Sequence, residues 1–382
     1  LGEVNFIDGL AKVPADFGET GDYGEWKPIE YSGSYGTNGF YLPFKQDYTV
    51  EGFSTVLSTG NATAKYVGGV GFQPDLVWNK TRSANQNHFL YDAIRGTGKE
   101  LRSNQTNAEG TNDGVTAFSS DGFSRGTSND CNENGITYVD WCWDMGGSNA
   151  TNTAGSITST VRANASYGQS IVTYDGNNGG TVGHGLSSAP DMLIWKQRDG
   201  TDAWMVWHSG YGNNGFQQLN TTAAAVGEYS WFMGSTAPSS TLVTMGNGGT
   251  VNASGNSYVM YAFHDVTGYS KFGTYTGNGN ASGTSVTTGF EPAFVLVKAS
   301  SSGDMTHKHW TIRDNTRSPN NDRTKGLHAN KSEAEFDASN NAMAFSSTGF
   351  QLKGTDPGIN ESGTTYIYMA FADTREYAYW LD

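Results

Sequence analysis

The chain has 382 residues and a formal net charge of −14, with 23 Lys and Arg against 37 Asp and Glu. This acidic balance provides no basic stripe for phosphates, so nucleic acid is excluded as an expected partner. No apolar stretch reaches the roughly 18 residues that a membrane-spanning helix requires. Charged residues make up only 16% of the chain, whereas aromatic residues reach 13% and Gly numbers 51. Because this composition is poor in helix formers and rich in turn and strand formers, it predicts an all-β protein.

Residues 1–47 differ from the rest of the chain and are interpreted as an N-terminal connector or arm. Glu3 to Ile7 predicts one short strand, and the Gly, Tyr and Pro residues that follow favour turns. The chain begins at Leu1 with neither Met nor a signal-like segment. We therefore expect either a processed N-terminus or a missing upstream part, and the latter would supply a pairing partner for the strand.

A motif with the pattern NxxGxxY followed by an apolar strand occurs three times, at Cys131 to Trp143, Val251 to Phe263 and Ile359 to Phe371. Asn can bond its own backbone and Gly permits a positive φ, so each copy predicts a turn. The strand that follows is apolar on both faces, which is typical of the middle of a sandwich or barrel. The expected structural anchors of this motif are Gly135, Gly255, Gly363, Tyr138, Tyr258 and Tyr366.

A second anchor precedes each motif: a Pro, an apolar strand, and a Lys six residues after the Pro. The prolines are Pro74, Pro190 and Pro292. The spacing predicts three homologous antiparallel β-sandwich modules of roughly 100 residues each, at 48–147, 166–268 and 269–382. Residues 148–165 are rich in Ser, Thr, Asn and Gly and are interpreted as a linker or an exposed strand. We expect the modules to pack around a local pseudo-threefold axis.

The first and third repeats share further features that the second lacks. Ala117 to Phe123 (AFSSDGF) and Ala344 to Phe350 (AFSSTGF) both predict a tight hairpin, whereas the second repeat has a longer segment there. Acidic residues also correspond: Asp92 matches Asp314 and Glu109 matches Glu335, but the second repeat has His208 and Ala225. Asn104, Asn220 and Asn330 occupy equivalent positions and are expected to cap the backbone.

No catalytic motif is found in any repeat, so no catalytic residue and no enzymatic activity are predicted. The spacing of His307 and His309 has no convincing third ligand, and no metal site is predicted. No cofactor is expected; calcium at Asp175 to Gly180 or Asn129 to Asn134 is the weaker alternative to turn chemistry. Cys131 and Cys142 are interpreted as packing residues, with a disulfide as the alternative.

Aromatic residues without evident repeat equivalents are the candidate binding residues. They gather in the second repeat, where the hairpin is replaced, and flat rings beside polar side chains suit stacking on sugars. The alternative is that they fill a larger core or a seam between repeats. The candidate glycan or receptor contacts are Trp204, Trp207, Tyr211, Tyr229 and Trp231.

The motifs carry a resemblance to a known group of proteins. Residues Tyr31 to Phe44 (YSGSYGTNGFYLPF), with the patterns at Gly71 to Lys80, Ala117 to Phe123 and Asn132 to Trp143, resemble marine bacteriophage tail-fibre-like and appendage proteins. In those proteins, such a connector follows a laminin-G or concanavalin-like sandwich and precedes tandem β-modules. The resemblance covers essentially the whole chain but lacks the upstream sandwich. More loosely, the strand pattern is similar to H-type lectin sandwiches, which work as trimers.

The resemblance implies a virion or extracellular location. The expected function is a non-enzymatic structural and adhesive protein, part of a phage tail fibre or surface appendage that binds host glycans. Expected partners are other virion or appendage subunits and a host surface glycan. We also expect the chain to form a homo-oligomer, and a trimer is favoured. The alternatives are a purely architectural filament or capsid-decorating subunit and a polysaccharide depolymerase.

Overall fold

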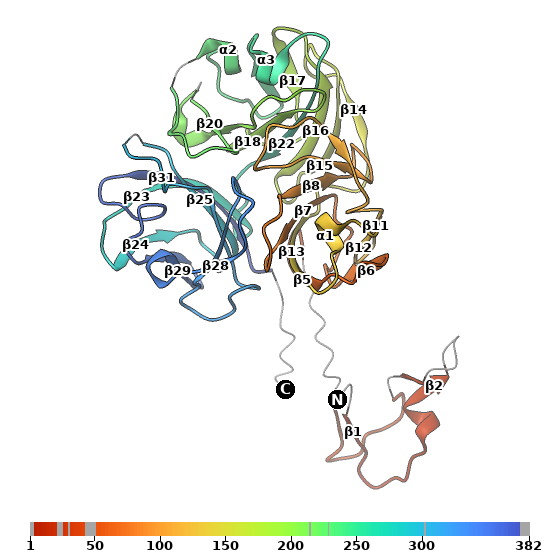
Figure 1. The fold of residues 1–382 in the computed structure, drawn as a ribbon. Coiled ribbons are helices and arrows are strands. Elements are labelled where there is room, and N and C mark those ends of the chain that lie inside the picture. Colours follow the sequence, from red (N-terminus) through yellow and green to blue (C-terminus); the bar gives the residue numbers. More distant parts are fainter. Residues whose placement is uncertain are drawn as a thin grey trace. The chain divides into compact units, whose positions relative to one another are not determined.

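The computed structural model describes residues 4–20, 26–29, 31–42, 51–213, 215–227, 229–301 and 303–374. The chain divides into two compact units, Leu1–Thr49 with Arg375–Asp382, and Val50–Thr374. The strands in both units pair antiparallel, and strands are far more frequent than helices (Figure 1). The all-β prediction is confirmed at this level. No helix in the described parts of the chain is long and apolar enough to cross a membrane.

The smaller unit contains two short antiparallel strand pairs. Strand β1 (Val4–Phe6) pairs with β4 (Phe40–Leu42), β2 (Gly18–Thr20) pairs with β3 (Trp26–Pro28), and the 3₁₀ helix η1 (Pro14–Asp16) lies between β1 and β2 in the chain. The rings of Phe6 and Phe40 stack with centroids 5.4 Å apart. A strand near the start is therefore confirmed, and β4 of the same unit pairs with one of its edges; an upstream pairing partner stays a prediction.

The larger unit is built on three central sheets, which we call sheets A, B and C. Sheet A has the order β5-β13-β7-β8, with strands Phe53–Thr59, Thr137–Trp143, Leu76–Thr81 and Phe89–Asp92. Sheet B has the order β14-β15-β16-β22-β18-β19-β20, with strands Ala150–Asn152, Ser159–Asn164, Gln169–Asp175, Ser257–Phe263, Met192–Gln197, Met205–His208 and Gln217–Gln218. Sheet C has the order β23-β31-β25-β26-β27-β28, with strands Ser270–Thr276, Thr365–Ala372, Pro292–Ala299, Thr311–Asp314, Lys325–His328 and Phe336–Asp337. In each sheet, the strand after the NxxGxxY motif (β13, β22 or β31) lies directly beside the strand after the Pro anchor.

The segment predicted as a linker, 148–165, is part of sheet B. Its strands β14 and β15 pair with each other, and β15 pairs with β16 from Ser159↔Tyr174 to Asn164↔Gln169. Of the two interpretations of this segment, the structure has the exposed strand. The boundaries at 147, 165 and 268 fall inside one compact unit and stay predictions.

A smaller sheet accompanies each central sheet. These sheets are β11-β12-β6 (Ala117–Ser119, Gly122–Arg125, Lys65–Gly68), β17-β21 (Gly180–Gly183, Leu242–Met245) and β24-β30-β29 (Ser282–Thr287, Gly349–Lys353, Ala342–Ser346). The two predicted hairpins are confirmed, with Ser119↔Gly122 and Ser346↔Gly349 closing them. A further pair joins β9 (Lys99–Glu100) and β10 (Gly110–Thr111). The remaining short elements are α1 (Asn129–Asn132), α2 (Ser230–Met233), α3 (Gly249–Asn252), η2 (Ser209–Tyr211) and η3 (Ser339–Asn341).

The two-faced apolar pattern of the motif strands has a direct structural cause. On one face, residues such as Cys142 and Val77 pack with Phe123 of the small sheet in a core that belongs to sheet A alone. On the other face, Trp141 and Trp143 enter a core shared with sheets B and C. Sheets B and C each have a corresponding separate core. Each central sheet is therefore buried on both faces, and burial of this apolar area is the main stabilising term.

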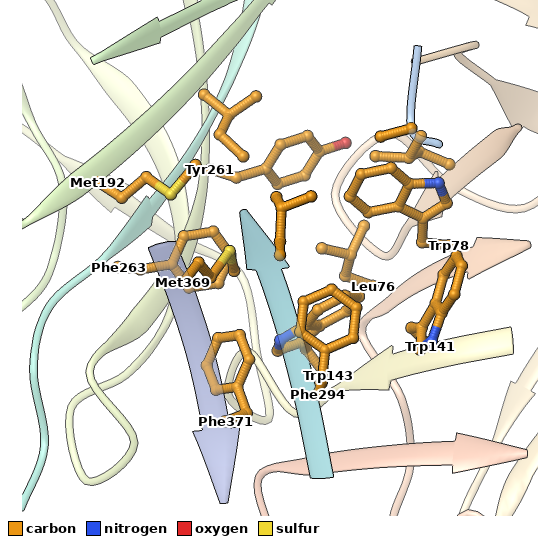
Figure 2. Packing of buried hydrophobic residues seen from close by; sticks show 14 of the residues in the cluster. Leu76, Trp78, Trp141, Trp143, Met192, Tyr261, Phe263, Phe294, Met369 and Phe371 are labelled. Carbon is orange, nitrogen blue, oxygen red and sulfur yellow. The ribbon is translucent and has the colours of Figure 1, made fainter. Parts of the chain in front are cut away.

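Aromatic and aliphatic side chains from all three central sheets form the shared core (Figure 2). Phe294 of sheet C lies 5.8 Å from Trp141 and 6.0 Å from Trp143 of sheet A, and Phe263 of sheet B lies 5.9 Å from Phe371 of sheet C, between ring centroids. A cavity of only about 10 Å³ remains at its centre. It has an entirely apolar lining: Leu76, Trp78, Leu90, Trp143, Ile194, Leu219, Tyr261, Phe263 and Met369.

The Asn and Tyr side chains of the NxxGxxY motif hold the turn before each motif strand through hydrogen bonds to the backbone, an arrangement we call the clamp. In the second copy, the Asn252 side chain accepts from Asn177 N (3.0 Å) and donates to Gly246 O (2.8 Å). The Tyr258 hydroxyl accepts from Ala253 N (2.9 Å) and donates to Gly249 O. Bonds of the same kind recur at Asn132 with Tyr138 and at Asn360 with Tyr366. The motif glycines have φ of 80°, 87° and 77°, so the predicted need for positive φ is confirmed.

Gly255→Ala is expected to lower the free energy of unfolding by about 1–2 kcal/mol, because its left-handed backbone disfavours a Cβ. Nothing lies within 4 Å of the added Cβ, so backbone strain is the sole cause. Gly249 is the matched control: its added Cβ also meets nothing within 4 Å, and its φ is not positive. Urea unfolding should show Gly249→Ala unchanged or slightly stabilised. Equal losses for the two variants would contradict the clamp.

Candidate functional site

Two of the five predicted contact residues are core residues. Trp204 is fully buried, and its indole Nε1 donates to Arg102 O of the first repeat (2.8 Å). Trp207 is 4% exposed and donates to Gly212 O (2.8 Å). Neither ring has a free face for a sugar, so the prediction of a glycan contact is wrong for both. The structure agrees with the alternative interpretation, in which these side chains fill the core or a contact between repeats.

Two residues beside the other central sheets hold positions like that of Trp204, contrary to the sequence interpretation. His88 and Trp310 begin the corresponding segments, and each donates a side-chain N–H across to another repeat: His88 Nε2 to His328 O (3.0 Å) and Trp310 Nε1 to Gln218 O (3.0 Å). The three bonds run in cyclic order, from sheet A to C, B to A and C to B. The sequence hides the equivalence with His88 because the residue type differs, and that with Trp310 because the capping Asn follows 20 residues later instead of 16.

Tyr211, the third candidate, is half-buried at the end of η2 and packs against the shared core. Its ring lies 5.8 Å from that of His208, and its hydroxyl donates to Gln217 Oε1. Burial raises the pKa of Tyr211 well above its ordinary value. This residue therefore belongs to the contact between sheets B and C.

Tyr229 and Trp231 form an exposed aromatic cluster together with Phe216. The Tyr229 ring is 44% exposed and lies 5.9 Å from Trp231, which in turn lies 5.2 Å from the buried Phe216. Gly248 lets the indole approach, since a Cβ there would meet Trp231 Cε3 at 2.2 Å. Helix α2 begins directly after Tyr229 and ends at Gly234 with φ 58°. Of the five candidates, these two are the ones brought together with accessible ring surface.

The aromatic cluster lies at the opposite end of β22 from the points where the chain enters and leaves the larger unit. Trp231 O accepts from Gly248 N, at the turn that precedes β22. The chain enters the larger unit near Glu51 and leaves it near Thr374. These two residues lie beyond the other end of the motif strands, where Glu51 N donates to Thr374 Oγ1 (3.0 Å). Seven residues of β22 separate the two ends, a distance of about 20 Å.

Buried polar networks join the central sheets, and we call these contacts seams. In seam A–B, Asp92 pairs with Arg95 and accepts from the Tyr261 hydroxyl of sheet B (2.8 Å). Glu109 bridges Arg95 and Arg198, with Arg198 Nε 2.9 Å from Glu109 Oε2. Asp92 and Arg95 have side chains with no exposed area. Such pairs specify geometry because removal of one member leaves a buried charge.

Seam C–A repeats this network with the same residue types. Asp314 pairs with Arg317 and accepts from Trp141 Nε1 of sheet A (3.1 Å). Glu335 bridges Arg317 and Arg82, with Arg82 Nη2 3.0 Å from Glu335 Oε1. The correspondence of Asp92 with Asp314 and Glu109 with Glu335 was visible in the sequence. The arginines three residues after each Asp repeat as well, and that spacing is the signal which predicts the ion pair.

Seam B–C occupies the third equivalent place without an ion pair. His208, Tyr211 and Ala225 stand where the other seams have Asp, Arg and Glu, and Ser300 replaces the second Arg. The backbone contact persists, since Ala225 N donates to Ser300 O (2.8 Å) as Glu109 N does to Arg198 O and Glu335 N to Arg82 O. All three seams thus share this backbone hydrogen bond. Among the described residues, ion pairs occur in seams A–B and C–A, whereas seam B–C has uncharged side chains at the same places.

The expected capping role of three asparagines is confirmed. Each accepts a backbone N–H sixteen to twenty residues earlier, at the start of the segment that crosses a seam: Asn104 from His88 N, Asn220 from Trp204 N, and Asn330 from Trp310 N.

The lysines six residues after each Pro are buried near the seams without a carboxylate partner among the described residues. Lys298 Nζ donates to Thr222 O (2.9 Å) and Ala299 O (2.8 Å). Burial, followed by the nearby charge of Lys308, lowers the pKa of Lys298 to about 7. Burial likewise lowers the pKa of Lys80 to about 7 and of Lys196 to about 8.

Among the residues that the structure describes, no three His, Cys, Asp or Glu side chains are placed to hold a metal. Residues 129–132 form the turn of helix α1, capped by Ser128, and Asn178 has φ 54° with its Oδ1 accepting from Ser254 N. Both loops proposed for calcium therefore use their polar groups in turns. Cys131 and Cys142 are free thiols, both buried, so the packing interpretation is confirmed over the disulfide.

These features define the class: an all-β protein whose three antiparallel sheets share one aromatic core and meet at buried polar seams. Residues 49–375 match the family described as "Domain of unknown function (DUF7483)", and the chain belongs to that family. Comparison with curated proteins and with solved structures gave no match.

Proposed function

We propose that this protein is a non-enzymatic structural and adhesive component of a bacteriophage tail fibre or surface appendage, acting at the virion or outside the cell. The resemblance of Tyr31 to Phe44 and of the repeated motifs to marine phage appendage proteins supports this assignment. So does a body held by aromatic packing and buried ion pairs, with no cluster of metal-ligating side chains in its described part. These features suit a rigid carrier more than a reaction site.

The body is proposed to be three tandem copies of one β-module closed into a ring with pseudo-threefold symmetry. Three observations support the copies: the common neighbour order of motif and Pro-anchored strands, the common clamp bonds, and the cyclic seam bonds. Each sheet contacts both others, so one chain supplies the three seams that a trimer of single modules would form. A homo-oligomer of the whole chain remains a separate proposal, with other virion subunits as expected partners.

Adhesion is assigned to the cluster of Phe216, Tyr229 and Trp231. Its exposed Tyr ring and partly buried indole offer apolar faces of the kind that stack on a pyranose ring. Within the larger unit, it lies about 20 Å along β22 from Glu51 and Thr374, where the chain enters and leaves that unit. This position is the observation that carries the glycan-binding proposal.

Tyr229→Ala is expected to weaken glycan binding by about tenfold, which corresponds to loss of about 1.4 kcal/mol of stacking. The intact protein is first screened on a glycan array, and the dissociation constant of the strongest ligand is then measured for each variant. Tyr66→Ala is the matched control, since Tyr66 is 51% exposed on β6, in the first repeat. The proposal fails if no glycan binds, or if Tyr229→Ala binds as tightly as Tyr66→Ala.

The architectural alternative has its own supporting observation. The smaller unit exposes Phe6 (49%), Leu10 (58%), Val13 (60%) and Phe40 (47%), which suits assembly with neighbouring subunits. Sedimentation of the full chain against residues 51–374 would show self-association lost with the arm. The depolymerase alternative predicts new reducing ends from host polysaccharide.

A further inference from the structure

One seam of the larger unit differs from the other two at its centre. His208 stands where Asp92 and Asp314 form ion pairs, and it is fully buried. Its Nδ1 accepts from Gly210 N (3.0 Å), and its Nε2 lies 3.4 Å from Tyr368 O of sheet C. Since a carbonyl can only accept, the proton is on Nε2 and the ring is neutral. Both ring nitrogens are thus used, and the neutral form is the one that fits.

Among the described residues, none forms an ion pair with His208. Tyr211 on η2 contacts the ring, and β31 presents the Tyr368 carbonyl. Asp191 meets Ser209 with its backbone carbonyl and its carboxyl, and that carboxyl also accepts from Asp265 N (2.9 Å), so it is engaged away from the His208 ring. A basic group of the same seam, Lys298 on β25, donates to Thr222 O. A proton on Nδ1 would remove the acceptor of Gly210 N and leave a buried charge without a partner.

We propose that seam B–C is an acid-sensitive gate, at which protonation of His208 separates sheets B and C while the ion pairs keep seams A–B and C–A closed. The separation exposes apolar surface that the shared core now covers, including Met192, Phe263 and Met369 (Figure 2). Burial lowers the pKa of His208 to about 4, which places the opening in moderately acidic solution. This inference goes beyond adhesion and holds whether or not a glycan binds.

Hydrogen exchange followed by mass spectrometry, corrected for the intrinsic effect of pH, tests the gate on the full chain. Between pH 7 and pH 4, peptides covering 205–219 and 365–372 are expected to lose protection by about tenfold or more. Peptides covering 89–101 and 137–143, in the seams with ion pairs, are expected to keep theirs. Seam C–A also has a buried histidine, His88, whose Nε2 donates to His328 O, but burial lowers the pKa of His88 well below its ordinary value, so that ring stays neutral while His208 gains its proton. Equal loss of protection at all three seams, or none at seam B–C, would overturn the proposal without any variant.

Two variants separate the role of His208 from general acid effects. His208→Asn keeps a polar side chain that does not titrate, and it should abolish the acid response of peptides 205–219 and 365–372. His184→Asn is the matched control: His184 is also buried, its pKa is also lowered to about 4 by burial, and its Nε2 bonds Ser239 O within the second repeat. It should respond as the parent does. An unchanged response in His208→Asn, or its loss in His184→Asn, would contradict the assignment.

A variant that carries the ion-pair residues of the other seams at seam B–C tests the proposal in the opposite direction. A variant with His208→Asp, Tyr211→Arg, Ala225→Glu and Ser300→Arg carries at seam B–C the residue types of seams A–B and C–A. We expect it to keep full protection at pH 4. If this variant opens at acid pH as the parent does, the missing ion pairs are not what makes the seam sensitive.

Discussion

Arg317→Met is expected to lower the free energy of unfolding by about 3–5 kcal/mol, because it leaves the Asp314 carboxylate buried without its partner. Asp314 and Arg317 have no exposed side-chain area, so water cannot replace the guanidinium. The same substitution also removes one of the two cations on Glu335 and a donor to Ile312 O. The loss is therefore larger than for a typical surface substitution.

Denaturant unfolding monitored by tryptophan fluorescence measures this effect, since Trp141 donates to Asp314 and reports on the seam. Lys331→Met is the matched control. Lys331 pairs with Glu333 at 3.0 Å, but the two side chains are 31% and 60% exposed, and such pairs contribute at most about 1 kcal/mol. Adding Asp314→Asn to Arg317→Met should recover part of the lost stability. A single variant as stable as Lys331→Met would show that the seam does not depend on the ion pair.

The elements near the repeated motifs could be predicted from the sequence because their causes are local. Gly135, Gly255 and Gly363 carry the positive φ that the pattern demands, and each apolar strand that contains the motif Tyr lies between two other strands of its sheet. Turn chemistry and strand periodicity need only neighbouring residues.

The candidate site was harder to predict because burial is a property of the whole fold. Trp204 and Trp231 look alike in the sequence, yet one is enclosed between sheets and the other partly reaches the surface. Sequence alone also did not reveal that Glu109 meets Arg198, which is far along the chain. Long-range pairing of this kind is decided by how sheets dock, and no local pattern encodes it directly.

The second large effect concerns pH: the stability that Lys298 contributes is expected to rise by about 2–3 kcal/mol between pH 7.5 and 9.5. The pKa of Lys298 is about 7 in the folded protein, against an ordinary value of 10.5. Over this interval the unfolded chain holds a proton that the folded chain has released, so raising the pH favours folding by about 1.4 kcal/mol per pH unit. The contribution is complete above pH 10.5 and is lost as the pH falls towards 7.

The measurement is the difference in unfolding free energy between the parent and Lys298→Met, taken at each pH so that titrating Tyr and acidic residues cancel. Methionine leaves Thr222 O and Ala299 O without the lysine donor, a cost of about 1–3 kcal/mol that does not vary with pH. Lys99→Met, at an exposed lysine on β9, removes the same charge and should give a flat difference. Parallel curves for Lys298→Met and its parent would mean that this lysine keeps its proton inside the fold. In that case a buried, unpaired ammonium would stand beside the seam that lacks ion pairs, and the carbonyls of Thr222 and Ala299 would have to stabilise its full charge.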